Sequence, residues 1–269
     1  MLKKRIAFLG VGNMATALMR GIIEAGLTRP EDIVISDINK ERLRVTSHEL
    51  QVIVAKDNRE AVKEADVIIL AVKPNDMEGL LSEIKESLDS KKLIISIAAG
   101  ITTSYIEKML KKEVPVIRIM PNTPVAVKEG ASAFSIGEYV SQEEEKIVKS
   151  IFGAVGKIVK VEENLMDAVT ALSGSGPAYI FYIIASLIEA AISLGLNKKT
   201  ATILAIQTVL GSAKLLQETG EEPAALKKKV TSKGGTTEAA LLVLDEGKLK
   251  ETLDKALKAA AKRSQELKR

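Results

Sequence analysis

The chain has 269 residues, of which 46% are hydrophobic, and its 39 basic and 35 acidic side chains give a net charge of +4. It has no cysteine and one histidine, His48, which excludes disulfides and thiolate chemistry and argues against zinc, so we expect no metal. The lysines are scattered and not interleaved with aromatic residues, so we expect no nucleic-acid partner.

Membrane and export signals are not evident in the sequence. The longest apolar stretch, residues 179–188, is shorter than the roughly 20 residues that span a bilayer. No small-residue cleavage site follows the basic start. We therefore expect no membrane association and a cytoplasmic location.

The first 161 residues alternate short β-branched runs with helical patterns, which is typical of strand-helix-strand units around a parallel sheet. Predicted helices in this part include 14–25, 76–87, 103–110 and 142–152. The predicted strands cover 5–9, 33–36, 52–54, 67–71, 93–97 and 116–119, with further strands near one edge at 131–136 and 157–161. This order predicts an α/β domain.

After residue 161 the strand-like runs stop and helical patterns continue to the C-terminus, so we expect two domains, 1–161 and 162–269. The predicted helices of the second domain cover 164–172, 177–194, 199–218, 223–230, 236–245 and 248–267. The helix 177–194 is apolar nearly all round and therefore needs burial on every side. We expect it to interleave with a second chain in an obligate homodimer; the alternative is a core helix of a monomer.

A glycine-rich turn follows the first strand and opens a helix. Its residues, Gly10-Val11-Gly12-Asn13-Met14-Ala15, match the GxGxxA fingerprint of dinucleotide-binding proteins. Gly10 permits the tight turn, Gly12 lets the backbone approach a pyrophosphate, and Ala15 allows close packing of helix on strand. The free N–H groups at the helix start would face the phosphates. The context predicts a Rossmann-type domain.

The second strand ends at Ser36 and Asp37, where an acidic residue would bind the ribose hydroxyls and favour NAD. A helix N-cap is the alternative role for Asp37. Ser36, Asn39, Lys40 and Arg42 would supply donors and positive charge to a 2′-phosphate. The preference between NADPH and NADH therefore stays open.

Two further loops stand at carboxyl ends of predicted strands, where open α/β sheets bind ligands. The first, Ala71-Val72-Lys73-Pro74, is predicted to border the ribose and nicotinamide. The second, Met120-Pro121-Asn122-Thr123-Pro124, contains paired prolines that would form a rigid wall for the nicotinamide, or only stiffen the loop.

Small polar residues gather twice in the helical half, at 173–179 and 230–237, and each cluster precedes a helix. Backbone N–H groups at helix N-termini form sites for anions such as a substrate carboxylate. Ordinary helix capping is the alternative.

The chain contains, in this order, FLGVGNMA, AVKP, SIAAGI, MPNTP, LSGSGPAY, GSAKLL and VTSKGGTTEAAL. With these motifs in both halves it resembles the pyrroline-5-carboxylate reductase family. The resemblance implies reduction of 1-pyrroline-5-carboxylate, a cyclic imino acid, to L-proline by hydride transfer from NADPH or NADH, in the last step of proline biosynthesis. It also implies a C-terminal all-helical dimerisation domain and dimers that can gather into a larger ring.

Site residues follow from the resemblance position by position. The implied cofactor contacts are Gly10, Gly12, Asn13, Met14, Asp37, Asn58, Ala71, Val72, Lys73 and Pro74, to which the strand ends add Ser36 and Asn122. The implied substrate contacts are Glu163, Ser175, Gly235, Thr236 and Thr237. Lys233 stands where the family often has proline, which loosens the turn before Gly234.

The absence of an obvious acid or base constrains the mechanism. The helix after SGSGPAY has no lysine before Lys198, although a hydroxyacid dehydrogenase would need a lysine or histidine there. A protonated cyclic imine is already electrophilic and chiefly needs orientation in a dry site. We predict that Thr237 hydrogen-bonds the ring nitrogen and is the catalytic side chain. A β-hydroxyacid dehydrogenase and a non-enzymatic dinucleotide sensor remain the alternative functions.

Overall fold

The computed structural model describes residues 1–268 and divides them into two compact units. The first unit comprises Met1–Ser175 together with the segment from Ala260 onward. The second unit comprises Gly176–Ala259.

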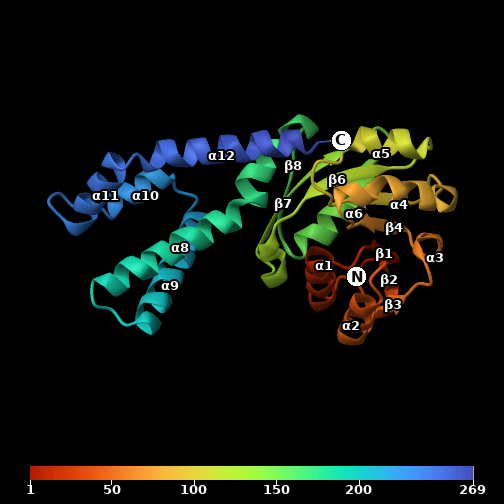
Figure 1. Cartoon of the computed structure of the whole chain (residues 1–269), viewed down its shortest axis with the longest axis horizontal. Coiled ribbons are helices and arrows are strands. Elements are labelled where there is room, and N and C mark those ends of the chain that lie inside the picture. Colours follow the sequence, from red (N-terminus) through yellow and green to blue (C-terminus); the bar gives the residue numbers. More distant parts are fainter. Residues whose placement is uncertain (269) are drawn as a thin grey trace. The chain divides into compact units, whose positions relative to one another are not determined.

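A mixed sheet forms the centre of the first unit (Figure 1). Its strand order is β3-β2-β1-β4-β5-β6-β7-β8, and β1 to β6 are mutually parallel whereas β7 runs antiparallel to β6. The strands are β1 (Ile6–Leu9), β2 (Ile33–Ser36), β3 (Ile53–Val54), β4 (Val67–Leu70), β5 (Leu93–Ser96), β6 (Val116–Met120), β7 (Gly130–Ile136) and β8 (Gly156–Lys160). The structure confirms the predicted strands and the Rossmann-type order of the first six.

Helices cover both faces of this sheet because successive strand residues point to opposite sides. Ile6 and Phe8 of β1 pack into one core, and Ala7 and Leu9 pack into the other. The first core contains side chains of α1 (Asn13–Glu24) and α6 (Gln142–Gly153), with α2 (Lys40–Leu50) at its margin. The second contains those of α3 (Asn58–Glu64), α4 (Met77–Ile84) and α5 (Thr103–Leu110). Short 3₁₀ segments include η2 (Pro74–Asp76) and η4 (Thr123–Val127).

Residues after β8 still belong to the first unit. They form η5 (Glu163–Leu165), α7 (Met166–Val169) and a π-helical segment (Thr170–Gly174). Asp167 is buried and accepts hydrogen bonds from Ser264 Oγ (2.8 Å) and Lys268 Nζ (3.4 Å). A Cβ on Gly100 would lie 2.7 Å from the Leu267 carbonyl oxygen, so this end of the chain packs closely on the loop after β5. The compact units therefore divide after Ser175. The domain boundary between 161 and 162 stays a prediction.

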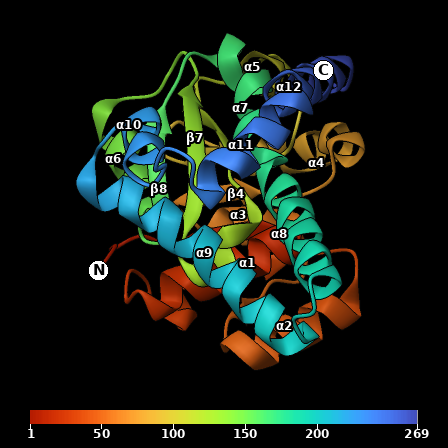
Figure 2. The same ribbon diagram turned by 90° about the vertical axis from the view of Figure 1, so that its left-hand side faces the viewer.

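The second unit is all helical, as predicted. It contains α8 (Gly176–Ser193), α9 (Lys198–Thr219), α10 (Pro223–Lys229), α11 (Thr236–Glu246) and most of α12 (Leu249–Glu266). α8 and α9 pack against each other as a helical hairpin (Figures 1 and 2). Within one chain α8 has no buried residue, and its exposed apolar side chains include Ile180, Phe181, Tyr182, Ile183, Leu187 and Ile192.

The helical run Glu163–Ser193 is long and apolar enough, by length and composition alone, to cross a membrane. The sequence had suggested otherwise because only its uninterrupted apolar stretch was counted. Its most apolar part is not buried within the described chain, so this surface needs a partner of some kind.

Candidate functional site

The glycine-rich loop joins the ends of three strands in the first unit. Gly10 has φ +98°, and a Cβ there would lie 2.7 Å from the Ala71 carbonyl oxygen after β4. The Gly10 N–H donates to the Ser36 carbonyl at the end of β2 (2.8 Å). Only glycine accommodates both the positive φ and this close approach.

At the start of α1 the backbone is open to a ligand. Gly12 is the N-cap and offers no side-chain cap, and a Cβ on it would meet nothing within 4 Å. Among the contacts of residues 1–268, none is recorded for the N–H groups of Asn13, Met14 and Ala15. Unpaired N–H groups at a helix N-terminus fit a pyrophosphate, so this loop can hold a dinucleotide.

A cavity of about 420 Å³ extends from this loop. It brings together predicted cofactor residues from three strand ends and from α3: Gly10, Gly12, Ser36, Asp37, Asn58, Ala71, Val72 and Lys73. The Asn58 amide donates to Glu83 (2.8 Å), which also lines the cavity. The cavity lies at the carboxyl ends of β1, β2 and β4, where the sequence placed it.

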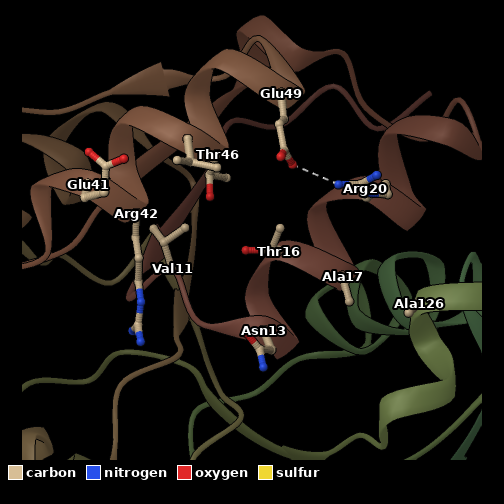
Figure 3. A pocket seen from close by; sticks show the side chains of 11 residues that line it. Val11, Asn13, Thr16, Ala17, Arg20, Glu41, Arg42, Thr46, Glu49 and Ala126 are labelled. Atoms are coloured by element: carbon tan, nitrogen blue, oxygen red, sulfur yellow. Dashed lines mark hydrogen bonds and ion pairs between the residues drawn. The ribbon is translucent and has the colours of Figure 1, made fainter.

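A second cavity, of about 590 Å³, lies between α1 and α2 (Figure 3). Asn13 and Thr16 of α1 line it together with Arg42 of α2. An ion pair between Arg20 and Glu49 (3.0 Å) crosses from one helix to the other. Arg42 lines both cavities and therefore lies where they adjoin.

Three predicted cofactor residues lie in neither cavity lining. Met14 is half-buried against the hydrophobic core, and Pro74 opens η2. Asn122 is buried, and its Oδ1 accepts the Ala131 N–H (2.8 Å), so this side chain holds the loop after β6 against β7. Their roles toward a cofactor stay predictions.

The Asp37 carboxylate has partners on both oxygens. Oδ2 accepts the Val11 N–H (2.6 Å) and Oδ1 accepts the Asn39 N–H (2.7 Å). The N-cap of α2 is Asn39, whose Oδ1 accepts the Arg42 N–H (3.0 Å), so the alternative that Asp37 caps this helix is wrong. Asp37 instead ties the glycine-rich loop to the segment after β2.

Glu163 is held entirely by residues of the first unit. Its carboxylate accepts the Thr103 N–H (2.9 Å) and hydroxyl (2.8 Å), and it pairs with Arg118 Nη1 (3.4 Å). The Arg118 side chain is 2% exposed. Sequence reasoning missed this contact, although an arginine in the middle of a buried strand was a signal that a carboxylate had to lie near it.

Ser175, the other predicted substrate residue of this unit, follows the π-helical segment. Its N–H donates to the Thr170 carbonyl (2.8 Å), which closes that wide turn. Single π turns are frequent at functional sites. Its hydroxyl has no recorded bond among the described contacts.

The predicted substrate residues of the second unit meet at the start of α11. Gly234 has φ +71° and its N–H donates to the Glu238 carboxylate (2.7 Å). A Cβ on Gly235 would meet the Ser232 side chain, which would have to rotate away. Within the described part of the chain no bond is recorded for the N–H groups of Thr236 and Thr237, or for the Thr237 hydroxyl. The free N–H groups at this helix start are of the kind that can bind an anion such as a carboxylate.

Comparison with known proteins decides the family. The pyrroline-5-carboxylate reductase of Methanosarcina acetivorans is 44% identical over 98% of this chain and 98% of its own. This chain belongs to the pyrroline-5-carboxylate reductase family. The enzyme of that name from Arabidopsis thaliana is 42% identical over 98% of this chain and 95% of its own.

Family models and solved structures agree with this membership. A model described as pyrroline-5-carboxylate reductase dimerisation matches residues 163–267, and one described as NADP oxidoreductase, coenzyme F420-dependent, matches residues 5–100. A pyrroline-5-carboxylate reductase structure from Coxiella burnetii has a TM-score of 0.93 and 42% identity, with both chains fully covered. The Plasmodium falciparum pyrroline carboxylate reductase with NADP bound has a TM-score of 0.90 and 32% identity over 99% of each chain.

Proposed function

We propose that this chain reduces 1-pyrroline-5-carboxylate to L-proline with NADPH or NADH, as the last step of proline biosynthesis. The observation that carries the proposal is the 44% identity over 98% of the chain with a reductase of that name. The open glycine-rich loop and the free N–H groups of α11 support it independently of any relative.

The cofactor would lie along the carboxyl ends of β1, β2 and β4. The N–H groups at the start of α1 would hold the pyrophosphate, and Ala71 to Pro74 would border the ribose and nicotinamide. When bound, the reduced nicotinamide supplies the hydride for the reaction. No cluster of three metal-binding side chains occurs among residues 1–268, and the proposed reaction requires none.

The substrate would be held by the N-terminus of α11. The N–H groups of Thr236 and Thr237 and the helix dipole favour a carboxylate there. The Thr237 hydroxyl would then hydrogen-bond the ring nitrogen and orient the C=N bond. Because the protonated imine is electrophilic without further activation, no acid or base side chain is needed.

The apolar surface of α8 supports a homodimer, since the family model that covers it is described as dimerisation. A partner helix would bury the side chains that one chain leaves exposed. A larger ring of dimers and a cytoplasmic location remain part of this proposal.

The direct test is oxidation of NADPH and NADH by the purified protein with and without 1-pyrroline-5-carboxylate. Substrate-dependent oxidation with proline as product supports the proposal. Binding of dinucleotide without turnover would indicate a sensor, and oxidation of β-hydroxyacids instead would indicate a β-hydroxyacid dehydrogenase. Each of these results would overturn the proposed reaction.

A further inference from the structure

The segment of residues 163–175 carries two predicted substrate residues, Glu163 at its start and Ser175 at its end. It consists of η5, the short helix α7 and the π-helical turns before α8, and contains no strand or long helix. Helical pieces this short do not hold their shape without tertiary contacts. The contacts that fix the segment therefore decide where the two side chains lie.

Both ends of the segment are fixed to the sheet side of the first unit. Glu163 is bonded to Thr103 at the start of α5 and pairs with Arg118 of β6. At the other end, a Cβ on Gly174 would lie 2.6 Å from the terminal methyl carbon of Met120, the last residue of β6. The π-helical turns thus pack directly on the carboxyl end of β6, the edge at which α/β sheets bind ligands.

A third contact fixes the middle of the segment, and it comes from the end of α12. Asp167 is 3% exposed, and its carboxylate accepts hydrogen bonds from the Ser264 hydroxyl (2.8 Å) and the Lys268 ammonium (3.4 Å). In Figure 2 this end of α12 lies beside α7. It also packs on the loop after β5, where Gly100 has φ +76° and leaves no room for a side chain beside the Leu267 carbonyl. A buried carboxylate requires such partners, so the contact is specific.

We propose that the Asp167–Ser264 pair positions the substrate residues of segment 163–175, so that the end of α12 sets the affinity for substrate without touching it. The inference rests on the proposed function, which makes Glu163 and Ser175 substrate contacts. Asp167 and Ser264 are positioning residues, since both side chains are buried and neither lines a dinucleotide cavity. Loss of the pair should therefore affect the substrate and not the cofactor.

Steady-state kinetics of Ser264→Ala separate positioning from stability. A weakened contact that serves ground state and transition state equally raises KM and leaves kcat unchanged, whereas partial unfolding removes active enzyme and leaves KM unchanged. Ser264→Ala should raise KM for 1-pyrroline-5-carboxylate about three- to tenfold, and change kcat and the KM for NADPH less than about twofold. A fall in kcat with an unchanged substrate KM would overturn the positioning role.

Thr252→Val is the matched control, because Thr252 lies on the same helix and its hydroxyl donates to the Lys248 carbonyl (3.0 Å) four residues earlier. It should leave the substrate KM unchanged. The double variant Asp167→Ala, Ser264→Ala should raise KM no more than Asp167→Ala alone, since both changes remove the same bond. Effects that multiply, or equal effects of Ser264→Ala and Thr252→Val, would overturn the pairing.

Amide hydrogen exchange tests the same contact without substrate. The Ser175 N–H donates to the Thr170 carbonyl, so its exchange reports whether the π-helical turns keep their shape. Ser264→Ala should speed exchange across residues 163–175 about three- to tenfold and leave α1 unchanged. Unchanged exchange in the segment would overturn the inference. A wild-type chain that does not reduce 1-pyrroline-5-carboxylate would refute the proposed function alone, because faster exchange in Ser264→Ala would still support the hold of α12 on the segment.

Discussion

The two glycines of the loop after β1 are required for different reasons, which gives a prediction at the scale of single residues. Gly12→Val should fold normally, because a Cβ there meets nothing within 4 Å, but should abolish dinucleotide binding by filling the space for the pyrophosphate. Gly10→Ala should instead lower the free energy of unfolding, by roughly 1–3 kcal/mol, because of its positive φ and its contact with Ala71. Thermal unfolding and nucleotide titration distinguish them; a Gly12→Val chain that binds nucleotide normally would contradict the site.

Thr237 is the residue at which the proposed chemistry can be tested most closely. Thr237→Ala should lower kcat/KM for pyrroline-5-carboxylate about five- to thirtyfold, which corresponds to about 1–2 kcal/mol for one neutral hydrogen bond. Thr236→Ala is the control, because it removes an exposed neighbouring hydroxyl and keeps the same backbone N–H groups. Steady-state kinetics in which the two variants behave alike would remove Thr237 from the catalytic site.

The sequence predicted that Gly10 permits the tight turn after the first strand, because the freedom to adopt a positive φ belongs to glycine itself. It could not predict the partners of Asp37, because these depend on the distance between the end of β2 and a loop 26 positions earlier. For the same reason it could not predict that Thr103 and Arg118, 60 and 45 positions from Glu163, hold the Glu163 carboxylate. The contact of Glu163 with substrate stays a prediction.

At the scale of elements, Glu163 joins η5 to the start of α5 and to β6. Glu163→Ala should lower the free energy of unfolding by roughly 2–4 kcal/mol, because it leaves the buried Arg118 without its carboxylate. Glu163→Gln should cost less, since an amide oxygen still accepts from Thr103. Denaturant unfolding measures both. If Glu163→Gln instead raised KM without changing the unfolding midpoint, the predicted contact with substrate would be supported over this structural role.

Glu107 ties α5 to the segment after β7, and this contact predicts a pH dependence. Burial raises the pKa of Glu107, as do the charges of Glu138 and Glu163, while the hydrogen bond from the Glu138 N–H opposes the shift. A raised pKa in the folded state means that the folded chain binds more protons than the unfolded one, so stability is lost as pH rises above the ordinary value of 4.5.

Glu107→Gln should therefore stabilise the protein more at pH 7 than at pH 4, because the amide never ionises and keeps the acceptor for Glu138. Urea midpoints at the two values measure this. Glu113→Gln, an exposed carboxylate near the same segment, is the control. Equal midpoint changes at both pH values would refute the prediction.

Most elements followed from hydrophobic periodicity and capping residues, as the coincidence of strand 33–36 and helix 103–110 with β2 and α5 shows. Hydrophobic periodicity did not predict that β7 runs antiparallel to β6. The alternation of apolar and polar residues is the same for either strand direction, and only the length of the connection through η4 distinguishes the two. The compact unit extends to Ser175 because Asp167 of α7 is held by Ser264, almost a hundred positions away, and the sequence does not show such a distant contact.

At the scale of the whole molecule, the apolar surface of the second unit predicts the assembly. Phe181 is 64% exposed in one chain and lies on α8, within the segment that the dimerisation model covers. Phe181→Glu should shift the protein from dimer to monomer or make it aggregate, because a partner helix would have to bury the carboxylate. Val127→Glu, at 70% exposure on η4 and outside that segment, is the matched control and should leave the mass unchanged. Light scattering over a concentration series measures the mass of both variants.

A dimer that persists in Phe181→Glu but dissociates in Val127→Glu would indicate that the interface lies in the first unit. A wild-type chain that is monomeric at all concentrations would refute the predicted dimer.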